Sequence, residues 1–330
     1  MSNEVDILEN DILKRDPALM EFLLIDHSRP KEGKKHGHII WATDNYEPMG
    51  DAYGENTQIS IESITGENGG IVQPRVKKSK AEQQSRARDK GEVFTPSWIC
   101  NRQNNLVDNE WFGFDNAFNE ETDEGWITKK DPVPFPTSKG FTWQDYVSDT
   151  RLEITCGEAP YLISRYDTIT GEIIPVHDRI GLLDRKLRVV AENTASPEEW
   201  FEWVLVAYQN IYAYEWQGDN LLLARENALY TFDDNYKEKF GVMPTKEMVR
   251  KIAEIISWNF WQMDGLKGVI PNTCHDDVQE IPSLFGDSEK VITPCPGCRD
   301  DNYKKHNGIY CKIMDWRKGK AERYIDSIKL

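Results

Sequence analysis

The chain has 330 residues, of which 39% are hydrophobic and 11% aromatic, so it can bury a sizeable core, which argues against wholesale disorder. Its net charge of −16 excludes a uniformly basic surface that would coat nucleic acid. No run approaches ~18 apolar residues and the first residues are polar and acidic, so we expect neither a membrane partner nor a signal peptide.

Apolar residues recur at helical spacing in several segments. We expect helices over residues 5–26, 98–106, 160–166, 180–192, 197–210, 219–236 and 245–256. Short apolar or alternating runs predict strands over 39–43, 59–64, 152–155 and 210–216. Segment 113–142 is rich in Gly, Pro and acidic residues and is typical of a loop. The alternation of helices and short strands predicts an α/β fold whose sheet is covered on both faces.

The segment from Glu153 to Leu162 predicts a strand, a tight turn and the start of a helix. Gly157 lets the backbone turn sharply and come close to a ligand. The free N–H groups of a following helix would point at the same spot. Such loops hold cofactors at the carboxyl ends of sheet strands, and an ordinary strand–turn–helix junction is the alternative.

A second motif lies upstream, where Phe94, Thr95 and Pro96 precede the helix expected at 98–106. Phe-Thr-Pro before a helix, followed by acidic-x-x-Cys-Gly-x-small, resembles the amino-methylating DNA methyltransferases, especially the adenine methylases of restriction systems. The resemblance implies a Rossmann-like methyltransferase fold that depends on S-adenosylmethionine (SAM). In that family the Phe-Thr-Pro segment covers the methionine end of SAM, and the Cys-Gly loop wraps the same cofactor.

Carried over to this chain, the two motifs imply a set of cofactor-binding residues. They are Phe94, Thr95, Pro96, Glu153, Cys156, Gly157, Glu158 and Ala159. Ala159 stands where the family usually has its second glycine, and Ile154 stands where it usually has proline. Alanine leaves space for a ligand but adopts positive φ less readily than glycine does.

A SAM fold also needs acidic residues at the ends of its next strands. The first accepts hydrogen bonds from the ribose hydroxyls. Glu215 is the first candidate and Asp184 the second, with a surface carboxylate as the alternative for either. For the acid that binds the adenine amine, Asp264 is the match to the family. Asp219 competes with it, but a role as helix N-cap is favoured for Asp219.

The catalytic motif of the family is absent from this chain. Amino-methylases carry a polar residue, Pro-Pro and an aromatic residue, which bind the target amine and stack on a flipped-out base. The chain has no Pro-Pro pair, and the resemblance covers roughly residues 90–270. No residue is therefore assigned a catalytic role, and we expect catalysis to need a partner subunit.

Charge is unevenly distributed along the sequence. Lys and Arg crowd residues 75–90, which could contact DNA phosphates or could form a solvated loop. Acidic tracts such as 119–124 could instead mimic a phosphate backbone.

The C-terminal region carries a C-x2-C-x7-H-x4-C pattern. Its residues are Cys295, Cys298, His306 and Cys311. Four such ligands suit tetrahedral zinc with no open position, so we expect a structural site. Cys274 or His275 could replace one ligand, and buried thiols beside a surface histidine are the alternative. The six cysteines are too few and too clustered for a secreted disulfide scaffold, which favours a reducing cytoplasm.

These features predict an N-terminal helical and loop region at 1–90, a SAM-binding domain at 91–272 and a Cys/His module at 273–330. The leading function is a DNA adenine methyltransferase-like modification subunit of a restriction-modification or mobile-element system. The alternative is a non-catalytic acidic protein on the same scaffold, which inhibits a DNA-binding enzyme as an anti-restriction or anti-nuclease DNA mimic. A DNA-binding regulatory module that uses residues 75–90 is a third hypothesis.

Overall fold

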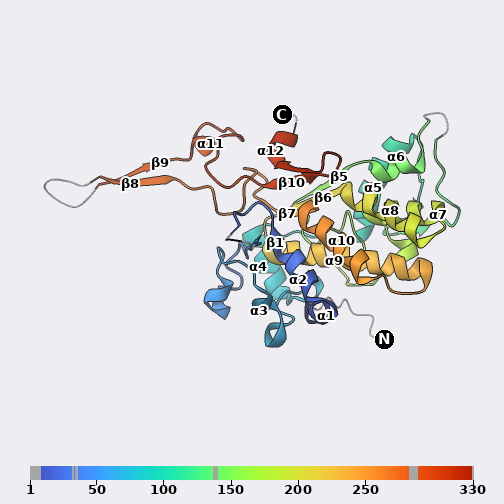
Figure 1. Cartoon of the computed structure of the whole chain (residues 1–330), viewed down its shortest axis with the longest axis horizontal. Coiled ribbons are helices and arrows are strands. Elements are labelled where there is room, and N and C mark those ends of the chain that lie inside the picture. Colours follow the sequence, from blue (N-terminus) through green and yellow to red (C-terminus); the bar gives the residue numbers. More distant parts are fainter. Residues whose placement is uncertain (1–8, 32, 34–35, 137–139, 282–288, 329–330) are drawn as a thin grey trace.

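The computed structural model describes residues 9–31, 33, 36–136, 140–281 and 289–328, and it is a mixed α/β structure with small sheets (Figure 1). The helices are α1 Glu9–Arg15, α2 Pro17–Leu24, α3 Ile61–Ile64, α4 Lys80–Lys90, α5 Ser97–Phe112, α6 Trp143–Ser148, α7 Leu182–Asn193, α8 Pro197–Gln209, α9 Gly218–Phe240, α10 Lys246–Asn259, α11 Pro296–Arg299 and α12 Tyr324–Ser327. The strands are β1 Ile25–Asp26, β2 Gly37–His38, β3 Asn119–Glu121, β4 Trp126–Thr128, β5 Arg151–Ile154, β6 Ile211–Glu215, β7 Phe260–Gln262, β8 Asp277–Ile281, β9 Glu289–Thr293, β10 Lys312–Asp315 and β11 Lys320–Arg323.

The central sheet is parallel and has the strand order β5-β6-β7. Glu153 of β5 lies opposite Ala213 of β6, and Glu215 of β6 lies opposite Gln262 of β7. Helices α7 and α8 connect β5 to β6, and α9 and α10 connect β6 to β7. Because the strands are parallel, their carboxyl ends meet at one edge, where open α/β sheets bind ligands.

Local signals fix the ends of the connecting helices. The Thr245 hydroxyl accepts a hydrogen bond from the Met248 N–H at the start of α10, and Ser196 caps α8 in the same way. Each cap satisfies an N–H group that has no partner inside its helix. The helices expected over 98–106, 180–192, 197–210, 219–236 and 245–256, and the strands expected over 152–155 and 210–216, are confirmed to within a few residues.

The helix expected over 160–166 is wrong. The N–H groups of Leu162 and Ile163 both turn back to the Ala159 carbonyl, at 3.1 and 2.9 Å, and the Glu153 carboxylate accepts the Leu162 N–H as well. The chain therefore leaves β5 through successive turns, and the described residues 156–175 contain no helix.

The helix expected over 5–26 is interrupted. Asp16 caps α2 by accepting a hydrogen bond from the Ala18 N–H, and Pro17 opens α2, so α1 and α2 are separate. Residues 5–8 of that expectation lie outside the described residues. The loop expected over 113–142 contains the hairpin β3–β4.

Two short strands expected near the N-terminus are also corrected. Residues 59–64 contain α3 instead, because Ser60 and Ser63 form a reciprocal capping box at its start. Residues 39–43 are limited to an isolated β-bridge at Ile40. At 59–64 local hydrogen bonding overrides the alternating pattern, and at 39–43 the backbone instead bonds to distant segments, such as Ile40 N–H to Gln262 Oε1 at 2.8 Å.

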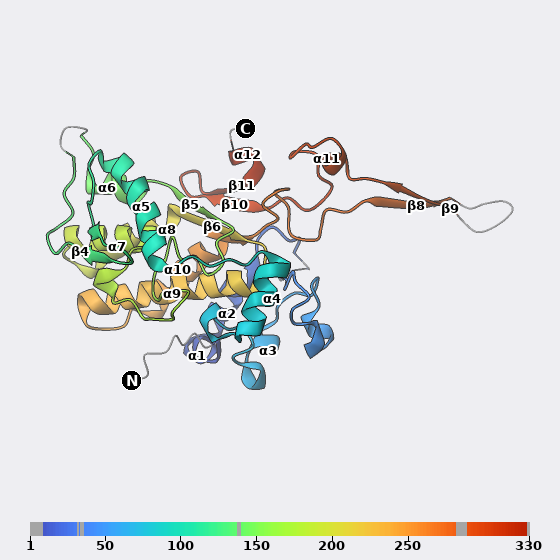
Figure 2. The ribbon, with the colours of Figure 1, turned by 180° about the vertical axis from the view of Figure 1, so that it is seen from behind.

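Alternate residues of β6 and β7 enter different cores. Ala213 and Phe260 belong to the main hydrophobic core, which the helices surround. Tyr214 and Trp261 face the other way and pack in a second cluster that includes Ile313 of β10. Helices thus cover one face of the sheet at β6 and β7, and the C-terminal strands cover the other (Figures 1 and 2).

Arg225, on α9, ties the N-terminal helices to the sheet. Its buried guanidinium donates to the carbonyls of Leu23 at 2.7 Å, Ile25 at 3.0 Å and Phe260 at 2.6 Å. The rigid donor fork of arginine suits several acceptors at once. The main core accordingly contains residues from both 1–90 and 91–272. The division of the chain into three regions stays a prediction.

Two buried carboxyl groups from α1 and α9 interact. Glu9 is 1% exposed and Glu226 is 0% exposed. Burial raises the pKa of Glu9 to about 7, and burial together with the charge of Glu9 raises the pKa of Glu226 well above its ordinary value. Neither Glu226 oxygen has a hydrogen-bond partner among the described residues. The folded state therefore opposes ionisation of this pair.

We expect Glu226→Gln to raise the free energy of unfolding by about 1–3 kcal/mol at pH 8, and to change it little at pH 5. The pKa of Glu9 in the folded state lies above its ordinary value of 4.5. The stability linked to this pair is therefore fully present below pH 4.5 and is lost as the pH rises through about 7. Urea unfolding at both pH values measures the difference, with the exposed Glu202→Gln as control. An equal effect of Glu226→Gln at pH 5 and pH 8 would contradict the linkage.

Candidate functional site

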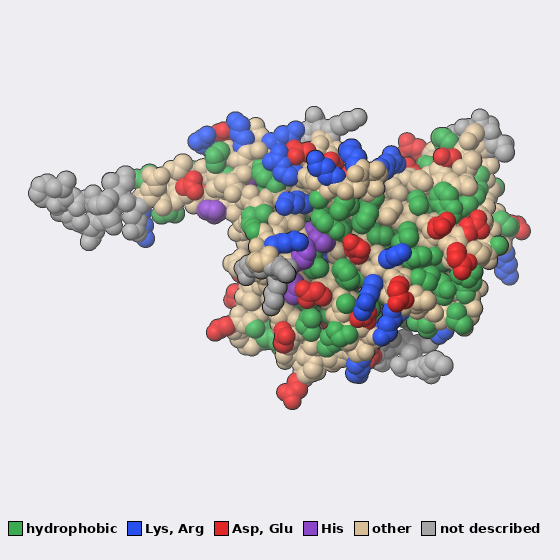
Figure 3. Space-filling view, viewed as in Figure 1, with side chains coloured by type: hydrophobic (Ala, Val, Ile, Leu, Met, Phe, Trp, Pro, Cys, Tyr) green, Lys and Arg blue, Asp and Glu red, His purple; other side chains and the backbone are tan. Residues whose placement is uncertain are grey.

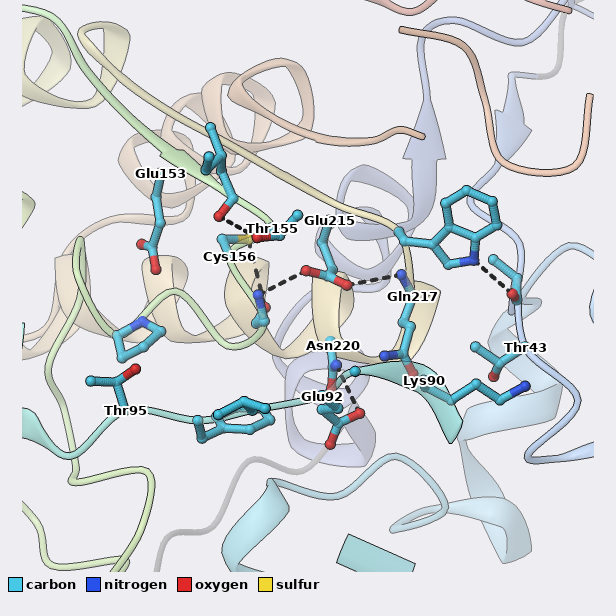
Figure 4. A pocket seen from close by; sticks show the side chains of 18 of the residues that line it. Thr43, Lys90, Glu92, Thr95, Glu153, Thr155, Cys156, Glu215, Gln217 and Asn220 are labelled. Atoms are coloured by element: carbon cyan, nitrogen blue, oxygen red, sulfur yellow. Dashed lines mark hydrogen bonds between the residues drawn. The ribbon is translucent and has the colours of Figure 1, made fainter. Parts of the chain in front are cut away.

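A cavity of about 690 Å³ opens at the carboxyl ends of β5 and β6 (Figure 4). Its walls come from the N-terminal region, the segment before α5, the loop after β5, the end of β6 and a residue that follows β7. A cavity of this size suits a small molecule or a cofactor.

The loop after β5 is held against its local preference. Thr155, Gly157 and Ala159 all have positive φ, of 47°, 54° and 63°. Glycine adopts such angles freely, whereas a β-branched threonine there is a strained outlier. Phe94 packs over this loop, since a Cβ added at Gly157 would lie 3.4 Å from its ring. Backbone strain of this kind concentrates at ligand-binding sites.

We expect Thr155→Gly to raise the free energy of unfolding by about 0.5–1 kcal/mol. Relief of the left-handed backbone strain, about 1–2 kcal/mol, outweighs the extra backbone entropy of glycine in the unfolded chain, about 0.5–1 kcal/mol. The Thr155 side chain is exposed and hydrogen-bonds the adjacent Ile154 carbonyl, so little packing is lost. Denaturant unfolding at fixed pH measures the change, and a loss of stability would show that the loop is not strained.

Glu215, the last residue of β6, joins the two strand ends. Its carboxylate accepts hydrogen bonds from the N–H groups of Gly157 at 2.9 Å and Gln217 at 3.1 Å. Burial raises its pKa, and these N–H donors partly offset that effect. A carboxylate has about four acceptor sites, so Glu215 can still accept from a ligand. The next residue, Trp216, also lines the cavity.

The cavity wall is acidic. Glu55, Glu92, Glu153 and Glu215 line it, with Lys90 as the basic lining residue. The Lys90 ammonium lies 2.6 Å from Asp44, and Glu92 is paired at 2.6 Å with the buried guanidinium of Arg86. Burial raises the pKa of Glu153 to about 8, and the N–H groups of the loop lower it only in part. Glu92, Glu153 and Glu215 surround the same space in Figure 4. A cation in the cavity would favour ionisation of these carboxyl groups, whereas an anion would oppose it, so the wall suits a cationic ligand better than an anionic one.

Three residues that line the cavity each carry an oxygen atom that is an open acceptor, although the atom itself is buried. Thr43 Oγ1, Glu92 Oε1 and Asn220 Oδ1 have no hydrogen-bond partner among the described residues. The amide of Asn220 donates to the other Glu92 oxygen at 3.2 Å, which orients both side chains. A buried acceptor without a donor costs about 1–3 kcal/mol. This wall suits a ligand that donates several hydrogen bonds.

The structure brings most of the sequence-predicted cofactor residues together. Those that line the cavity are Phe94, Thr95, Glu153, Cys156, Gly157 and Glu215. They come from two motifs and a strand end that are far apart in the sequence, and they converge because β5 and β6 are parallel neighbours.

Other predicted residues lie outside the cavity lining. Pro96 and Ala159 flank lining residues without lining the cavity. Glu158 is buried and accepts hydrogen bonds from the Tyr166 hydroxyl and from the Arg75 backbone N–H. Asp264 accepts the Leu266 N–H in a turn beyond β7. Asp184 is buried against Ser164, so Glu215 is the strand-end acid at the cavity.

Sequence reasoning missed several lining residues, including Thr43, Glu92, Trp216, Asn220 and Asn272. Glu92 and Trp216 adjoin predicted motifs, so proximity in the sequence could have indicated them. Thr43 and Asn272 come from distant segments, and spacing alone carries no signal for them.

The basic stretch 75–90 is partly internal. Arg86 is buried and donates to Asp219 at 2.7 Å, and Lys78 lies 3.4 Å from the same carboxylate. Asp219 is therefore held by ion pairs in the first turn of α9, while Gln217 occupies the N-cap position expected for Asp219. These contacts dock α4 against the start of α9 and leave fewer cations free for a phosphate backbone.

A second candidate site lies at the base of the hairpin β8–β9. Its residues are Cys274, Cys295, Cys298 and His306. Their ligand atoms all lie within 4.8 Å of one another, and the three sulfurs are 3.6–3.7 Å from His306 Nδ1. Tetrahedral zinc with bonds of about 2.3 Å to sulfur and 2.0–2.1 Å to nitrogen has ligand–ligand edges of about 3.5–3.8 Å. The group could therefore hold a metal such as zinc.

Local geometry supports this metal group. A Cβ added at Gly297 would lie 2.5 Å from His306 Nδ1, so glycine lets the Cys295–Cys298 turn approach the histidine. Removal from water raises the pKa of the Cys295 thiol, but N–H donors from Cys298 and Asn307 outweigh this and lower the pKa to about 6. A thiolate is the form that binds metal.

Cys311 is not part of this group, which corrects the predicted ligand set. Its buried thiol donates to the Gln262 carbonyl at 3.2 Å and packs in the second hydrophobic cluster. Burial raises the pKa of this thiol, which opposes the thiolate form. Cys274 occupies the fourth position, as the alternative ligand set allows.

Comparison with known proteins gives no relative: no protein-family model, curated sequence or solved structure matches the chain. Among the described residues, no helix is long and apolar enough to cross a membrane. The class of site is therefore defined by its geometry, an acidic cavity with open acceptors at parallel strand ends, beside a group of three cysteines and a histidine that could hold a metal.

Proposed function

We propose that the chain has a Rossmann-like SAM-binding fold and binds SAM in the cavity at the ends of β5 and β6. The observation that carries the proposal is the set of open acceptors on Thr43, Glu92 and Asn220 in an acidic wall. SAM offers matching donors in its ribose hydroxyls, its adenine amine and its ammonium group. Its sulfonium adds a positive charge that the carboxylates favour.

Residues of the cavity fit separate parts of this cofactor. Glu215 would accept hydrogen bonds from the ribose hydroxyls, as acids at this strand end do in dinucleotide folds. Trp216 offers an indole face to the adenine ring. Glu92 and Asn220 would accept from the ammonium group, and the Phe94 segment would cover the methionine end, as the family resemblance implies.

A phosphate-bearing cofactor fits this cavity less well. Phosphate sites use free N–H groups of a loop and the N-terminus of a helix. Here the Gly157 N–H donates to Glu215, and the described residues 156–175 contain no helix. Carboxylates at Glu92 and Glu215 would also repel phosphate charge.

The reaction we propose is methyl transfer to an adenine amine of DNA, with this chain as the cofactor-holding modification subunit of a restriction-modification or mobile-element system. SAM supplies the methyl group when bound. The residues of this chain bind and orient the cofactor. Because the sequence has no Pro-Pro-aromatic motif, the site for the flipped base is assigned to a partner subunit.

Calorimetric titration of the full chain with SAM tests the cofactor proposal. We expect one site per chain, tighter binding of SAM than of S-adenosylhomocysteine, which lacks the sulfonium charge, and weak binding of ATP and NAD. No heat at millimolar SAM, or tighter binding of ATP, would rule out the proposal. Transfer of a labelled methyl group to adenine-containing duplex DNA, with and without a co-purified partner, then tests the reaction.

No specific observation favours the inhibitory DNA mimic. The face shown in Figure 3 carries both signs of charge: Lys and Arg side chains gather along its upper edge, and others lie beside acidic side chains near its centre. In the acidic tract 119–124, the Glu121 carboxylate accepts a hydrogen bond from Asn105 and lies 3.7 Å from Arg102. A phosphate mimic needs a continuous row of free carboxylates, and this tract is partly neutralised within the chain.

A further inference from the structure

Asn272 connects the two candidate sites. It lines the cavity from a segment that follows β7, and it lies two positions before the metal-group residue Cys274. Two residues of chain span at most about 7 Å, so a displacement of Cys274 reaches the cavity wall directly. Asn272 also has a φ of +62°, a left-handed conformation that asparagine adopts more readily than most residues with a side chain.

The supports of this segment come from the strand and loop around His306. The Ile270 N–H donates to the Ile309 carbonyl at 2.8 Å, and the Ile309 N–H donates to Thr273 Oγ1 at 3.0 Å. Just beyond Cys274, His275 exchanges two hydrogen bonds with the Asn307 side chain, at 3.2 and 2.7 Å. The segment that carries Asn272 is thus bound on both sides to the loop that carries His306.

The approach of these two segments is close. A Cβ added at Gly308 would lie 2.9 Å from the Cys274 backbone nitrogen and 2.9 Å from Thr273 Oγ1. A metal bonded to both Cys274 and His306 would hold the segments at this separation, since Cys274 Sγ and His306 Nδ1 already lie 3.6 Å apart. Without the metal, hydrogen bonds and the packing of Ile270 in the second hydrophobic cluster still hold the segment that bears Asn272, but the direct link from Cys274 to His306 is reduced to a sulfur contact of 3.6 Å.

We propose that metal binding at Cys274, Cys295, Cys298 and His306 fixes Asn272 in the cavity wall, so that the metal and the cavity ligand bind cooperatively. This inference rests on the proposed function for the identity of the ligand, SAM. Coupling free energies between sites correspond to roughly 5–150-fold changes in affinity, and we expect about tenfold here. The hairpin β8–β9, which projects from the body in Figure 1, begins and ends beside the same metal group.

The test compares the zinc-loaded full chain with the chain after chelation. We expect SAM to bind about tenfold more tightly to the zinc-loaded form in calorimetry. By reciprocity, saturating SAM should raise zinc affinity by the same factor in competition with a chromophoric chelator. Equal SAM affinity of both forms would overturn the inference.

Two asparagine variants separate the coupling from loss of folding. Asn272→Ala should retain zinc and bind SAM more weakly. Its SAM affinity should be nearly the same with and without zinc, so that the ratio of the two affinities is close to one. Asn302→Ala, in the same module but away from the cavity lining, should retain zinc, SAM affinity and coupling. Undiminished coupling in Asn272→Ala would overturn the inference.

Amide hydrogen exchange gives a readout that needs no SAM. Zinc should slow exchange over residues 269–273 as well as around the ligand cysteines. If zinc leaves exchange at 269–273 unchanged, the inference fails whatever the cavity binds. If exchange there slows but SAM does not bind the zinc-loaded chain, the proposed function fails while the link from the metal to the cavity wall stands.

Discussion

Cys274→Ala is expected to purify without zinc, whereas Cys311→Ala is expected to retain one zinc per chain. The binding energy of a structural zinc, about 10–16 kcal/mol, depends on all four ligands, so losing one thiolate lowers affinity by several orders of magnitude. Cys274 belongs to the group whose spacing matches tetrahedral zinc, and Cys311 does not. Metal analysis by atomic emission after dialysis measures the difference.

The two variants serve as controls for each other. Cys311 is fully buried, so Cys311→Ala should lower the melting temperature modestly through a small cavity while leaving the metal in place. Cys298→Ala, at an exposed ligand, should behave as Cys274→Ala does. Loss of zinc from Cys311→Ala together with its retention in Cys274→Ala would show that Cys311 is the fourth ligand, as the sequence spacing predicts, and that Cys274 is not.

Glu215→Gln is expected to weaken SAM binding by about 10–100-fold. A hydrogen bond to a charged group contributes about 1.5–3 kcal/mol, and the sulfonium would favour ionisation of the Glu215 carboxyl and attract the resulting carboxylate. Glutamine keeps one carbonyl oxygen for the Gly157 N–H, so the loop after β5 should keep its shape. Calorimetric titration with SAM measures the affinity.

The matched control is Glu202→Gln on the exposed surface of α8, which removes the same charge far from the cavity lining. It should leave SAM affinity unchanged and so excludes an effect of net charge. Wild-type affinity in Glu215→Gln would show that this carboxylate does not contact the ligand. The assignment of Glu215 as the acceptor of the ribose hydroxyls would then be wrong.

Two strands of the central sheet, β5 and β6, and the connecting helices could be predicted from sequence because their signals are local, whereas β7 was not among the predicted strands. Apolar periodicity, the cap at Thr245 and the Ser196-Pro197 start all act within one or two turns of helix. The helix expected at 160–166 failed because Asp184, outside that segment, accepts the Ser164 N–H at 2.8 Å, a group that would otherwise donate within the helix.

The site could be predicted only where its residues belong to a motif. Phe94, Gly157 and Glu215 were found through motif and strand-end logic, and all three line the cavity. Thr43 and Asn272 reach it through tertiary packing, which leaves no periodic trace. Spacing likewise could not decide between Cys274 and Cys311, because only the fold shows which thiol enters the core.

The Arg225 contacts have a consequence for the synthesis of this chain on the ribosome. Arg225 and its acceptor at Leu23 are separated by 202 positions. At about 5–20 residues per second, α2 emerges roughly 10–40 s before its anchoring arginine exists. During that interval the apolar side of α2, with Leu19, Met20 and Leu23, has no core to enter. The nascent chain must therefore keep this apolar segment from non-specific association until the segment that carries Arg225 has been synthesised.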